Sequence, residues 1–315
     1  MSGGVKVAAV VGATASGKTS LAVELAKRLN GEVISADSMQ IYQGLSIATA
    51  KPTQEEMRGI PHHLIDFVPL EEEFSVARFC ELGHRAIEDI SGRNKLPIVC
   101  GGTGLYVDSL LNNIIFADVP SDEALREKLN ASFDRCGGDA LLNRLRNIDP
   151  ETAEKLSPAD KKRIVRGLEV YELTGTTLSE FSRRSRAFPD RYNSVMIGIG
   201  YRDRQKLYDR INRRVDMMLQ EGLLKEVKSF YSENAGKTVV QAIGCKELLP
   251  YLRGEQTFGE AVENLKRETR RFAKRQLTWF RRNDKIIWIY ADELNSSEQL
   301  AACAEKEIRT RLDLK

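Results

Sequence analysis

The chain has 315 residues, of which 42 % are hydrophobic, enough for one large domain or two smaller ones with a substantial core. Its 48 Lys and Arg residues nearly balance 45 Asp and Glu, so the net charge of +3 decides neither for nor against a nucleic-acid partner. There is no apolar run of about 18 residues and no room for a signal peptide before the first predicted strand, and the five scattered cysteines favour free thiols, so we expect a cytoplasmic protein without a membrane span.

The first predicted element is a buried strand over Val5–Val11, which leads through Gly-Ala-Thr-Ala-Ser-Gly-Lys-Thr into a helix over Ser20–Arg28. This is the spacing of a phosphate-binding loop, in which backbone N–H groups and a helix N-terminus face one anion. Lys18 can reach the outer phosphates and the Thr19 hydroxyl can hold Mg²⁺, whereas an ordinary glycine turn explains neither residue. The predicted diphosphate- or nucleotide-binding residues are Gly12, Ala13, Thr14, Ala15, Ser16, Gly17, Lys18 and Thr19.

Strands and helices alternate over the first hundred residues, which predicts an α/β fold with a parallel sheet core like that of the P-loop NTPases. A strand over Glu32–Ala36 precedes a helix over Phe74–Ser91 and a third strand over Leu96–Cys100. Ligands bind such sheets beyond the carboxyl ends of the strands. Three loops are therefore expected to meet at one crevice, those that begin at Gly12, Asp37 and Gly101.

The loops after the second and third predicted strands carry polar groups suited to a phosphorylated ligand and a base. Asp37 could bind Mg²⁺ through water or act as a general base, and the alternative is an Asx turn at the strand end. Gln40 could pair with adenine, although one Gln is a weak signal. The third strand ends in Gly101-Gly-Thr-Gly instead of an acid, which disfavours an ordinary ATPase, and Thr103 adds a hydroxyl there.

The middle of the chain is predicted to be a helical insertion into the α/β core. We place the core at residues 1–117 and 192–315 and the insertion at residues 118–191, with its clearest helix over Ala159–Leu173 and a mobile basic loop over Ser182–Arg191. The core then resumes with a strand, two long helices (the first of them interrupted or bent near Gly222), a final strand and a short closing helix. Their predicted ranges are Ser194–Gly200, Arg210–Phe230, Glu260–Arg282, Ile286–Tyr290 and the residues beyond Ala291.

Basic residues gather in three places although the whole chain is almost neutral. A solvated face is the ordinary explanation of one such run, but three of them indicate a surface for a phosphate backbone. The richest lies on the predicted helix from Glu260 and includes Lys274 and Arg275 beside aromatic rings that could stack on bases or belong to the core. The others comprise Lys161, Lys162, Arg163 and Arg166, and Arg202, Arg204, Arg210, Arg213 and Arg214.

Taken together, these features resemble the bacterial tRNA dimethylallyltransferases, the tRNA isopentenyltransferase family. Specific strings spread over nearly the whole chain carry the resemblance. Besides the phosphate-binding loop, they are Ser35-Ala-Asp-Ser-Met-Gln-Ile-Tyr, Ala48-Thr-Ala-Lys-Pro-Thr, Gly59-Ile-Pro-His-His-Leu-Ile-Asp, Gly101-Gly-Thr-Gly-Leu-Tyr, Arg163-Ile-Val-Arg-Gly-Leu-Glu and Ala273-Lys-Arg-Gln-Leu-Thr-Trp-Phe-Arg. The chain departs from the family pattern at Lys162, where Gln is frequent, and at Cys245, where Tyr is usual.

The resemblance implies transfer of a dimethylallyl group from dimethylallyl diphosphate to N6 of adenosine 37 in the anticodon stem-loop of a tRNA, with Mg²⁺ as cofactor. It matches Asp37 to the general base, and Lys18, Thr19, Thr103 and Arg214 to positions at the reacting centre. The expected tRNA contacts, to which the basic helix adds Lys274 and Arg275, are Asp37, Ser38, Met39, Gln40, Thr103, Arg126, Lys162, Arg163, Ile164, Val165 and Arg166. We expect a monomer, and the alternatives are a small-molecule kinase that uses ATP and a nucleotide-dependent RNA-binding switch.

Overall fold

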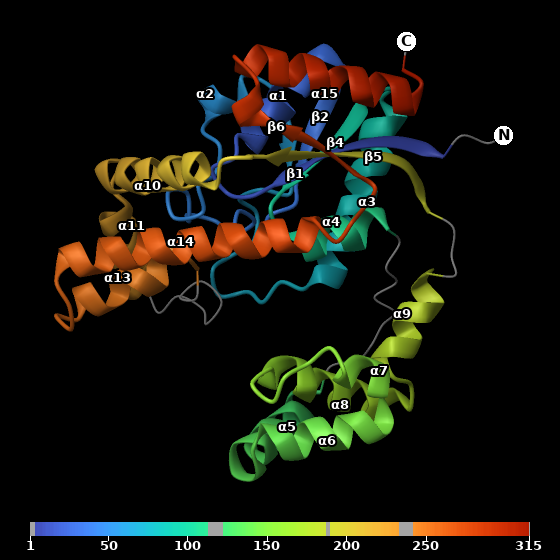
Figure 1. Cartoon of the computed structure of the whole chain (residues 1–315), viewed down its shortest axis with the longest axis vertical. Coiled ribbons are helices and arrows are strands. Elements are labelled where there is room, and N and C mark those ends of the chain that lie inside the picture. Colours follow the sequence, from blue (N-terminus) through green and yellow to red (C-terminus); the bar gives the residue numbers. More distant parts are fainter. Residues whose placement is uncertain (1–3, 113–121, 187–189, 233–241, 315) are drawn as a thin grey trace. The chain divides into compact units, whose positions relative to one another are not determined.

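The computed structural model describes residues 4–112, 122–186, 190–232 and 242–314 (Figure 1). The chain divides into two compact units. The first consists of residues 1–110 and 191–315, and the second of residues 111–190. Within the described part of the chain, every helix is too short or too polar to cross a membrane.

A six-stranded, fully parallel sheet forms the centre of the first unit, in the order β3-β2-β4-β1-β5-β6. This confirms the predicted α/β class. The phosphate-binding loop leaves the sheet near its middle, because β1 pairs with β4 on one side and with β5 on the other. The strands are β1 (Val5–Gly12), β2 (Gly31–Ser35), β3 (His62–His63), β4 (Leu96–Gly101), β5 (Tyr192–Gly200) and β6 (Ile286–Tyr290).

The sheet is covered on both faces, as a parallel sheet requires. Val7 to Val11 alternate between the two faces of β1 and are all 0 % exposed. Two helices, α1 (Lys18–Arg28) and α15 (Ser297–Leu312), pack side by side and share one hydrophobic cluster with the strands (Figure 1). Another helix, α3 (Val76–Gly92), contacts β1, β2 and β4. The remaining short helices of this part are α2 (Gln54–Met57), α4 (Gly104–Leu111) and η1 (Ala291–Glu293).

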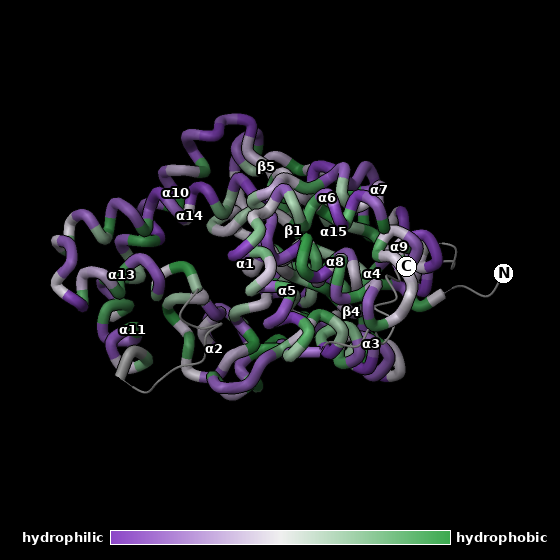
Figure 2. The backbone as a smooth tube through the Cα atoms, turned by 90° about the horizontal axis from the view of Figure 1, so that it is seen from below, coloured by the Kyte–Doolittle hydropathy of each residue, from purple (hydrophilic) through white to green (hydrophobic). Residues whose placement is uncertain are grey.

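A second core of the first unit lies among the helices that follow β5. The described helices here are α10 (Arg204–Gln220), α11 (Leu223–Ser232), α13 (Cys245–Leu252) and α14 (Phe258–Phe280). The long helix predicted to be interrupted or bent near Gly222 is interrupted there, because Gly222 adopts a left-handed φ of 104° between α10 and α11. The polar colour along α10 and α14 in Figure 2 shows how hydrophilic both helices are.

The second unit is helical and has its own hydrophobic cluster, which includes Leu129, Leu145 and Leu168. Its helices are α5 (Glu123–Cys136), α6 (Gly138–Ile148), α7 (Pro150–Ala153), α8 (Lys161–Thr174) and α9 (Leu178–Arg186). The loop predicted from Ser182 is wrong as far as Arg186, because these residues continue α9. The Thr177 hydroxyl accepts the N–H of Glu180 at the start of this helix. Residues 187–189 of the predicted loop and the predicted boundary at residues 117–118 lie outside the described residues.

Candidate active site

The loop between β1 and α1 has the geometry of an anion site. Gly17 precedes the helix with a left-handed φ of 98° and no side chain caps the helix, so the first N–H groups of α1 lack intrahelical acceptors. The Ser16 hydroxyl is buried in the loop and has no hydrogen-bond partner among the residues that the structure describes. A Cβ on Gly12 would lie 2.8 Å from the Ile199 carbonyl oxygen, so only glycine fits there. These features suit a phosphate group with several oxygen acceptors.

Three side chains hold the loop in place. Lys18 Nζ donates to the Ala13 carbonyl at 2.6 Å, and Arg210 Nε donates to the Ala15 carbonyl at 2.9 Å. The Thr14 N–H donates to Gln276 Oε1 at 2.8 Å. The amide of Thr14 therefore has a protein partner, contrary to the expectation that it faces a ligand. The sequence assigns Arg210 only to a basic surface, and it includes Gln276 in a string that resembles the family without giving that residue a role.

Lys18, Arg214 and Asp37 share one electrostatic environment, which brings together three of the predicted residues. The pKa of Lys18 is lowered to about 8, chiefly by burial; Cys100 and the charge of Asp37 act against this shift, and the charge of Arg214 contributes to it. Burial also lowers the pKa of Arg214, against the charges of Glu56 and Asp37. Two partly desolvated cations and one carboxylate thus lie beside the phosphate-binding loop, with Thr19 in the first turn of α1.

Asp37 forms an Asx turn, which was the alternative to a catalytic or metal-binding role. Only one of its carboxylate oxygens takes part in the turn. Its Oδ1 accepts the N–H of Met39 at 2.9 Å and that of Gln40 at 3.4 Å. The other oxygen has no hydrogen-bond partner among the described residues, so the turn orients the carboxylate without occupying it. The structural and the functional interpretations of Asp37 are compatible.

The loops after β2 and β4 are joined by backbone and hydroxyl contacts. Thr103 Oγ1 accepts the N–H of Ser38 at 3.1 Å, and the Thr103 N–H donates to the Ala36 carbonyl at 3.3 Å. A Cβ on Gly101 would lie 2.1 Å from the Ala36 carbonyl oxygen, so the close approach requires glycine. Two of the three loops expected to meet at one crevice, those that begin at Asp37 and Gly101, are therefore adjacent, and Thr103 orients the segment that carries Asp37.

The predicted role of Gln40 in base pairing does not fit its contacts. Gln40 Nε2 donates to the carbonyls of Thr49 and Ala50 at 3.2 and 3.0 Å, while its Oε1 accepts the Ser35 hydroxyl at 3.1 Å. Both ends of the amide are used within the protein. Gln40 therefore holds the loop at Thr49 and Ala50, and its amide has no free donor and acceptor pair to offer to adenine. Ser38 and Met39, its predicted companions, are half-buried.

The loop at residues 46–50, which Gln40 contacts, also binds a carboxylate that the sequence did not single out. Glu226 of α11 accepts the N–H groups of Ser46, Ile47 and Ala48 at 3.0, 2.8 and 2.8 Å. An isolated Glu on an amphipathic helix has the pattern of a solvent-facing residue, so no sequence signal distinguishes it. Arg214 also approaches this loop, at 3.5 Å from the Ala50 carbonyl oxygen.

In the second unit, the predicted tRNA contacts separate into exposed, paired and buried residues. Lys162 and Arg163 are exposed on α8. Ile164 and Val165 are 0 % and 3 % exposed in the helical core, so the prediction that they contact RNA is wrong for their side chains. The remaining two, Arg126 and Arg166, bind the fully buried Glu169 at 3.1 and 2.9 Å.

The basic helix α14 presents two faces. Gln276 is buried, whereas Lys274 and Arg275 are exposed and have no carboxylate partner among the described residues. Several other cations of the helix are neutralised locally, such as Arg271 by Glu268 at 2.6 Å. Trp279 is half-buried and its Nε1 donates to Asp108 Oδ2 at 2.6 Å, so the polar edge of this ring is used within the protein.

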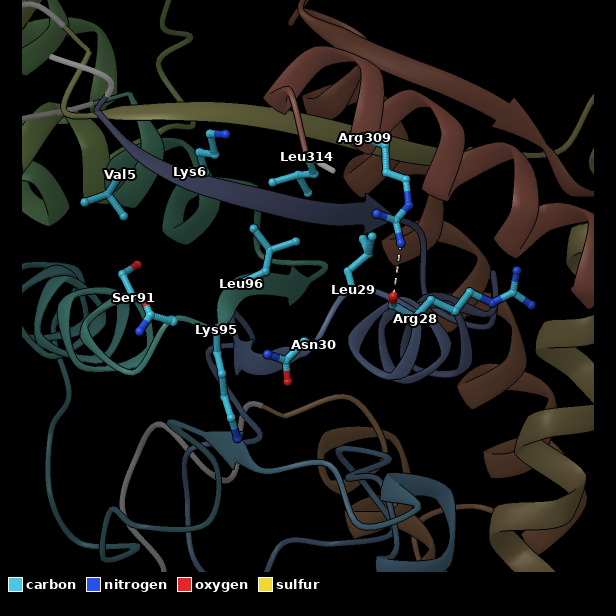
Figure 3. Close-up of a pocket in the computed structure, with 11 residues that line it drawn as sticks. Val5, Lys6, Arg28, Leu29, Asn30, Ser91, Lys95, Leu96, Arg309 and Leu314 are labelled. Carbon is cyan, nitrogen blue, oxygen red and sulfur yellow. Dashed lines mark hydrogen bonds between the residues drawn. The ribbon is translucent and has the colours of Figure 1, made fainter.

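A separate pocket of about 460 Å³ lies at the other end of the strands, where β1 and β4 begin (Figure 3). Its cations are already engaged: Arg28 contacts Glu24 and Glu305, Lys95 contacts Glu32, and Lys6 donates to the Asp313 carbonyl. The loops described above leave the sheet at the other end of these strands.

No cluster of three or more His, Cys, Asp or Glu side chains suited to a metal occurs within the part of the chain that the structure describes. A magnesium ion bound at the Thr19 hydroxyl would have to take most of its oxygen ligands from phosphate groups and water, as Mg²⁺ commonly does. The residues present fit a metal that enters together with a phosphorylated ligand.

A parallel sheet, a glycine-rich loop at the start of α1 and an adjoining carboxylate define an α/β protein of the P-loop type with an added helical unit. The chain belongs to the IPP transferase family, whose model matches residues 40–283. This confirms the family resemblance found in the sequence.

Relatives and solved structures agree with this assignment. The tRNA dimethylallyltransferase of Acetivibrio thermocellus is 52 % identical over 93 % of this chain and 94 % of its own length, and that of Halalkalibacterium halodurans is 47 % identical over 94 % of each. The crystal structure of the tRNA isopentenylpyrophosphate transferase from Bacillus halodurans has a TM-score of 0.74 at 44 % identity, covering 98 % of this chain and 97 % of that one. A eukaryotic dimethylallyltransferase acting on tRNA gives 0.82 at 33 % identity, over 97 % and 80 %.

Proposed function

We propose that this protein transfers the dimethylallyl group of dimethylallyl diphosphate to N6 of adenosine 37, next to the anticodon of a tRNA, and releases diphosphate. The observation that carries the proposal is the position of the Asp37 carboxylate beside Lys18 and Arg214 at the phosphate-binding loop. A proton acceptor and the cations for a leaving phosphate are thereby in one site. The relatives' names supply the substrate class.

In this reaction the C–O bond to the diphosphate breaks and a C–N bond to the base forms. Negative charge develops on the leaving diphosphate, and the proposed groups that stabilise it are the N–H groups at the start of α1, Lys18 and Arg214. Bound Mg²⁺ would neutralise further phosphate charge, with the Thr19 hydroxyl as its protein ligand. Burial of Lys18 strengthens its attraction to that charge, because water screens it less.

The exocyclic amine of adenine loses a proton as its nitrogen is alkylated, since its lone pair is otherwise delocalised into the ring. Asp37 is the proposed acceptor, through the carboxylate oxygen that its Asx turn does not use. Thr103 supports it indirectly by holding the neighbouring Ser38. The base reaches this site from a loop of RNA, where unstacking costs less than in a duplex.

Exposed cations are the proposed contacts for the anticodon stem-loop. They are Lys274 and Arg275 in the first unit, and Lys162 and Arg163 in the second. Contacts of this type to the phosphate backbone give affinity that falls with rising salt and carries little base information. Base selection is then left to the site around Asp37.

Asp37→Asn is the sharpest test, because Asn keeps an oxygen for the Asx turn but cannot accept the proton. The protein is incubated with unmodified tRNA and dimethylallyl diphosphate, and the nucleosides are analysed by mass spectrometry. We expect one dimethylallyl group on adenosine with the wild type, and turnover lower by about 10²-fold or more with Asp37→Asn at similar tRNA affinity.

Two outcomes would contradict the proposal. One is no added mass on the nucleosides, and the other is full activity of Asp37→Asn. ATP-dependent phosphorylation of a small molecule would instead indicate a kinase. A protein that binds RNA under nucleotide control without modifying it would indicate a switch.

A further inference from the structure

Gln276 bridges two loops of the candidate active site through both ends of its amide. Its Oε1 accepts the Thr14 N–H at 2.8 Å, and its Nε2 donates to the Gly102 carbonyl at 2.9 Å. The side chain is only 5 % exposed, so these bonds form where water competes little. The first loop carries the phosphate-binding residues, and the second carries Thr103.

The fit around this amide is tight. A Cβ on Gly102 would lie 2.2 Å from Gln276 Nε2, so a side chain at that position would displace the amide. One helical turn further, Trp279 packs on Gly104, where a Cβ would lie 2.1 Å from the ring, and donates to Asp108. The inner face of α14 thus contacts the chain on both sides of Thr103.

From Gln276, one short path of contacts leads to the general base and another to the diphosphate loop. Thr103 holds the N–H of Ser38, the neighbour of Asp37, at 3.1 Å. On the other side, Thr14 lies within the loop that ends at Lys18 and Thr19. An amide is the suitable group at this position, because it donates and accepts at once, whereas a carboxylate only accepts.

We propose that Gln276 is a positioning residue of the transferase, which fixes the separation between the bound diphosphate and Asp37. It need not touch either substrate. The inference rests on the proposed function, because the separation matters only if a leaving group and a proton acceptor act in the same step. A displacement of about 1 Å between such groups can lower the rate by about 10²-fold.

Two substitutions test the two hydrogen bonds. Gln276→Leu has similar size and makes neither bond. Gln276→Glu keeps the acceptor for Thr14 and, while ionised, cannot donate to Gly102. We expect both variants to lower kcat/KM for dimethylallyl diphosphate by about 10- to 100-fold near neutral pH. Their tRNA affinity stays within about twofold of the wild type, because Lys274 and Arg275 are unchanged.

The pH profile distinguishes positioning from loss of structure. A buried carboxyl takes up a proton more readily than an exposed one, and the carboxyl introduced by Gln276→Glu, once protonated, would donate to Gly102 again. The activity of Gln276→Glu relative to the wild type therefore rises as pH falls from about 8 to 5.5. The relative activity of Gln276→Leu stays low throughout this range. Equal, pH-independent ratios for the two variants overturn the proposal.

Leu265→Ala is the control for a general weakening of α14. Leu265 is 1 % exposed on the same helix and packs in a cluster with α11, α13 and residues 41–45, which includes no described residue of the two loops. It should lower the melting temperature without changing kcat/KM of the folded enzyme. If the Gln276 variants do not fold, Gly102→Ala serves instead, since its added methyl group must displace the Gln276 amide.

The outcomes separate this inference from the proposed function. An inactive wild type refutes the transferase reaction itself. An active wild type together with Gln276→Leu activity within twofold of it refutes only the role of Gln276.

Discussion

At the scale of single residues, burial modifies charged groups that an exposed surface would leave unchanged. Lys18 has a pKa lowered to about 8 by desolvation, with Asp37 acting against the shift. A fraction of its ammonium groups is therefore deprotonated in mildly alkaline solution before ligand binds. A bound diphosphate favours the charged form, so ligand binding and protonation of Lys18 are linked.

The affinity of the free enzyme for dimethylallyl diphosphate should therefore fall as pH rises above about 8. Phosphate esters complete their ionisation near pH 6, so a loss of affinity above pH 8 must come from titration of a group on the protein. Calorimetric titration at several pH values measures it, and Lys18→Ala should bind weakly with no such pH dependence. Wild-type affinity that stays constant well beyond pH 8 would contradict this assignment.

Stability responds to Lys18 in the opposite direction. Between about pH 8 and the ordinary lysine value of 10.5, the unfolded chain binds more protons at this residue than the folded one. The contribution of Lys18 to the free energy of unfolding therefore increases with pH over this range. A loss of diphosphate affinity there cannot be ascribed to destabilisation through Lys18.

At the scale of elements, α14 separates two tasks by its two faces. Gln276 and Ala273 are buried toward the site, while Lys274 and Arg275 are exposed. Charge reversal on the outer face should thus affect tRNA binding and leave the diphosphate site intact. Gln276 should then control kcat/KM, whereas its neighbours Lys274 and Arg275 should control the affinity for tRNA.

Lys274→Glu and Arg275→Glu should each weaken tRNA binding and reduce the slope of log affinity against log salt by about 1. Filter binding over a salt series measures both quantities. Lys306→Glu, an equal charge change at an exposed position of α15, is the matched control and should have little effect. If all three variants behave alike, the effect is one of net charge and α14 is not the contact surface.

The elements also show what sequence alone can predict. The strand, loop and helix around Lys18 combine a local motif with local periodicity, so their positions were predictable to within a residue or two. Gln276 and Glu226 bind atoms 174 to 180 residues away, at Gly102 and Ser46, and no local pattern encodes such partners. The helical part of the predicted basic loop was missed because a run of Ser and Arg has the composition of a loop, whereas packing of the second unit buries Ser185 in α9.

At the scale of the whole molecule, the two units have separate hydrophobic clusters. Glu169 lies in the second unit and accepts the Asp122 N–H at 3.1 Å besides binding Arg126 and Arg166. Burial by itself raises the pKa of this carboxyl, but its donors outweigh burial and the pKa is lowered. Its stabilising effect is present above the ordinary pKa of Glu and is lost as pH falls through the lowered value.

Glu169→Ala should destabilise the second unit by about 1–3 kcal/mol, because it removes the buried acceptor of the Asp122 N–H and of two ion pairs whose arginines are partly exposed. Diphosphate binding by the first unit should persist. Hydrogen exchange resolved by peptide measures the first effect and calorimetry the second. Glu172→Ala removes a pair with Arg144 on the exposed side of the same helix and should cost less than about 1 kcal/mol. Equal exchange in the two variants would contradict the role of Glu169.

The carboxylate of Glu226 on the amides of Ser46, Ile47 and Ala48 has a consequence for ligand selectivity. Three consecutive backbone donors of this kind would otherwise constitute a second anion receptor, in the loop that Arg214 also approaches. An internal side chain saturates them permanently. These amides therefore offer no hydrogen bond to a phosphorylated molecule. Binding of such a molecule at residues 46–48, instead of at the phosphate-binding loop, is disfavoured.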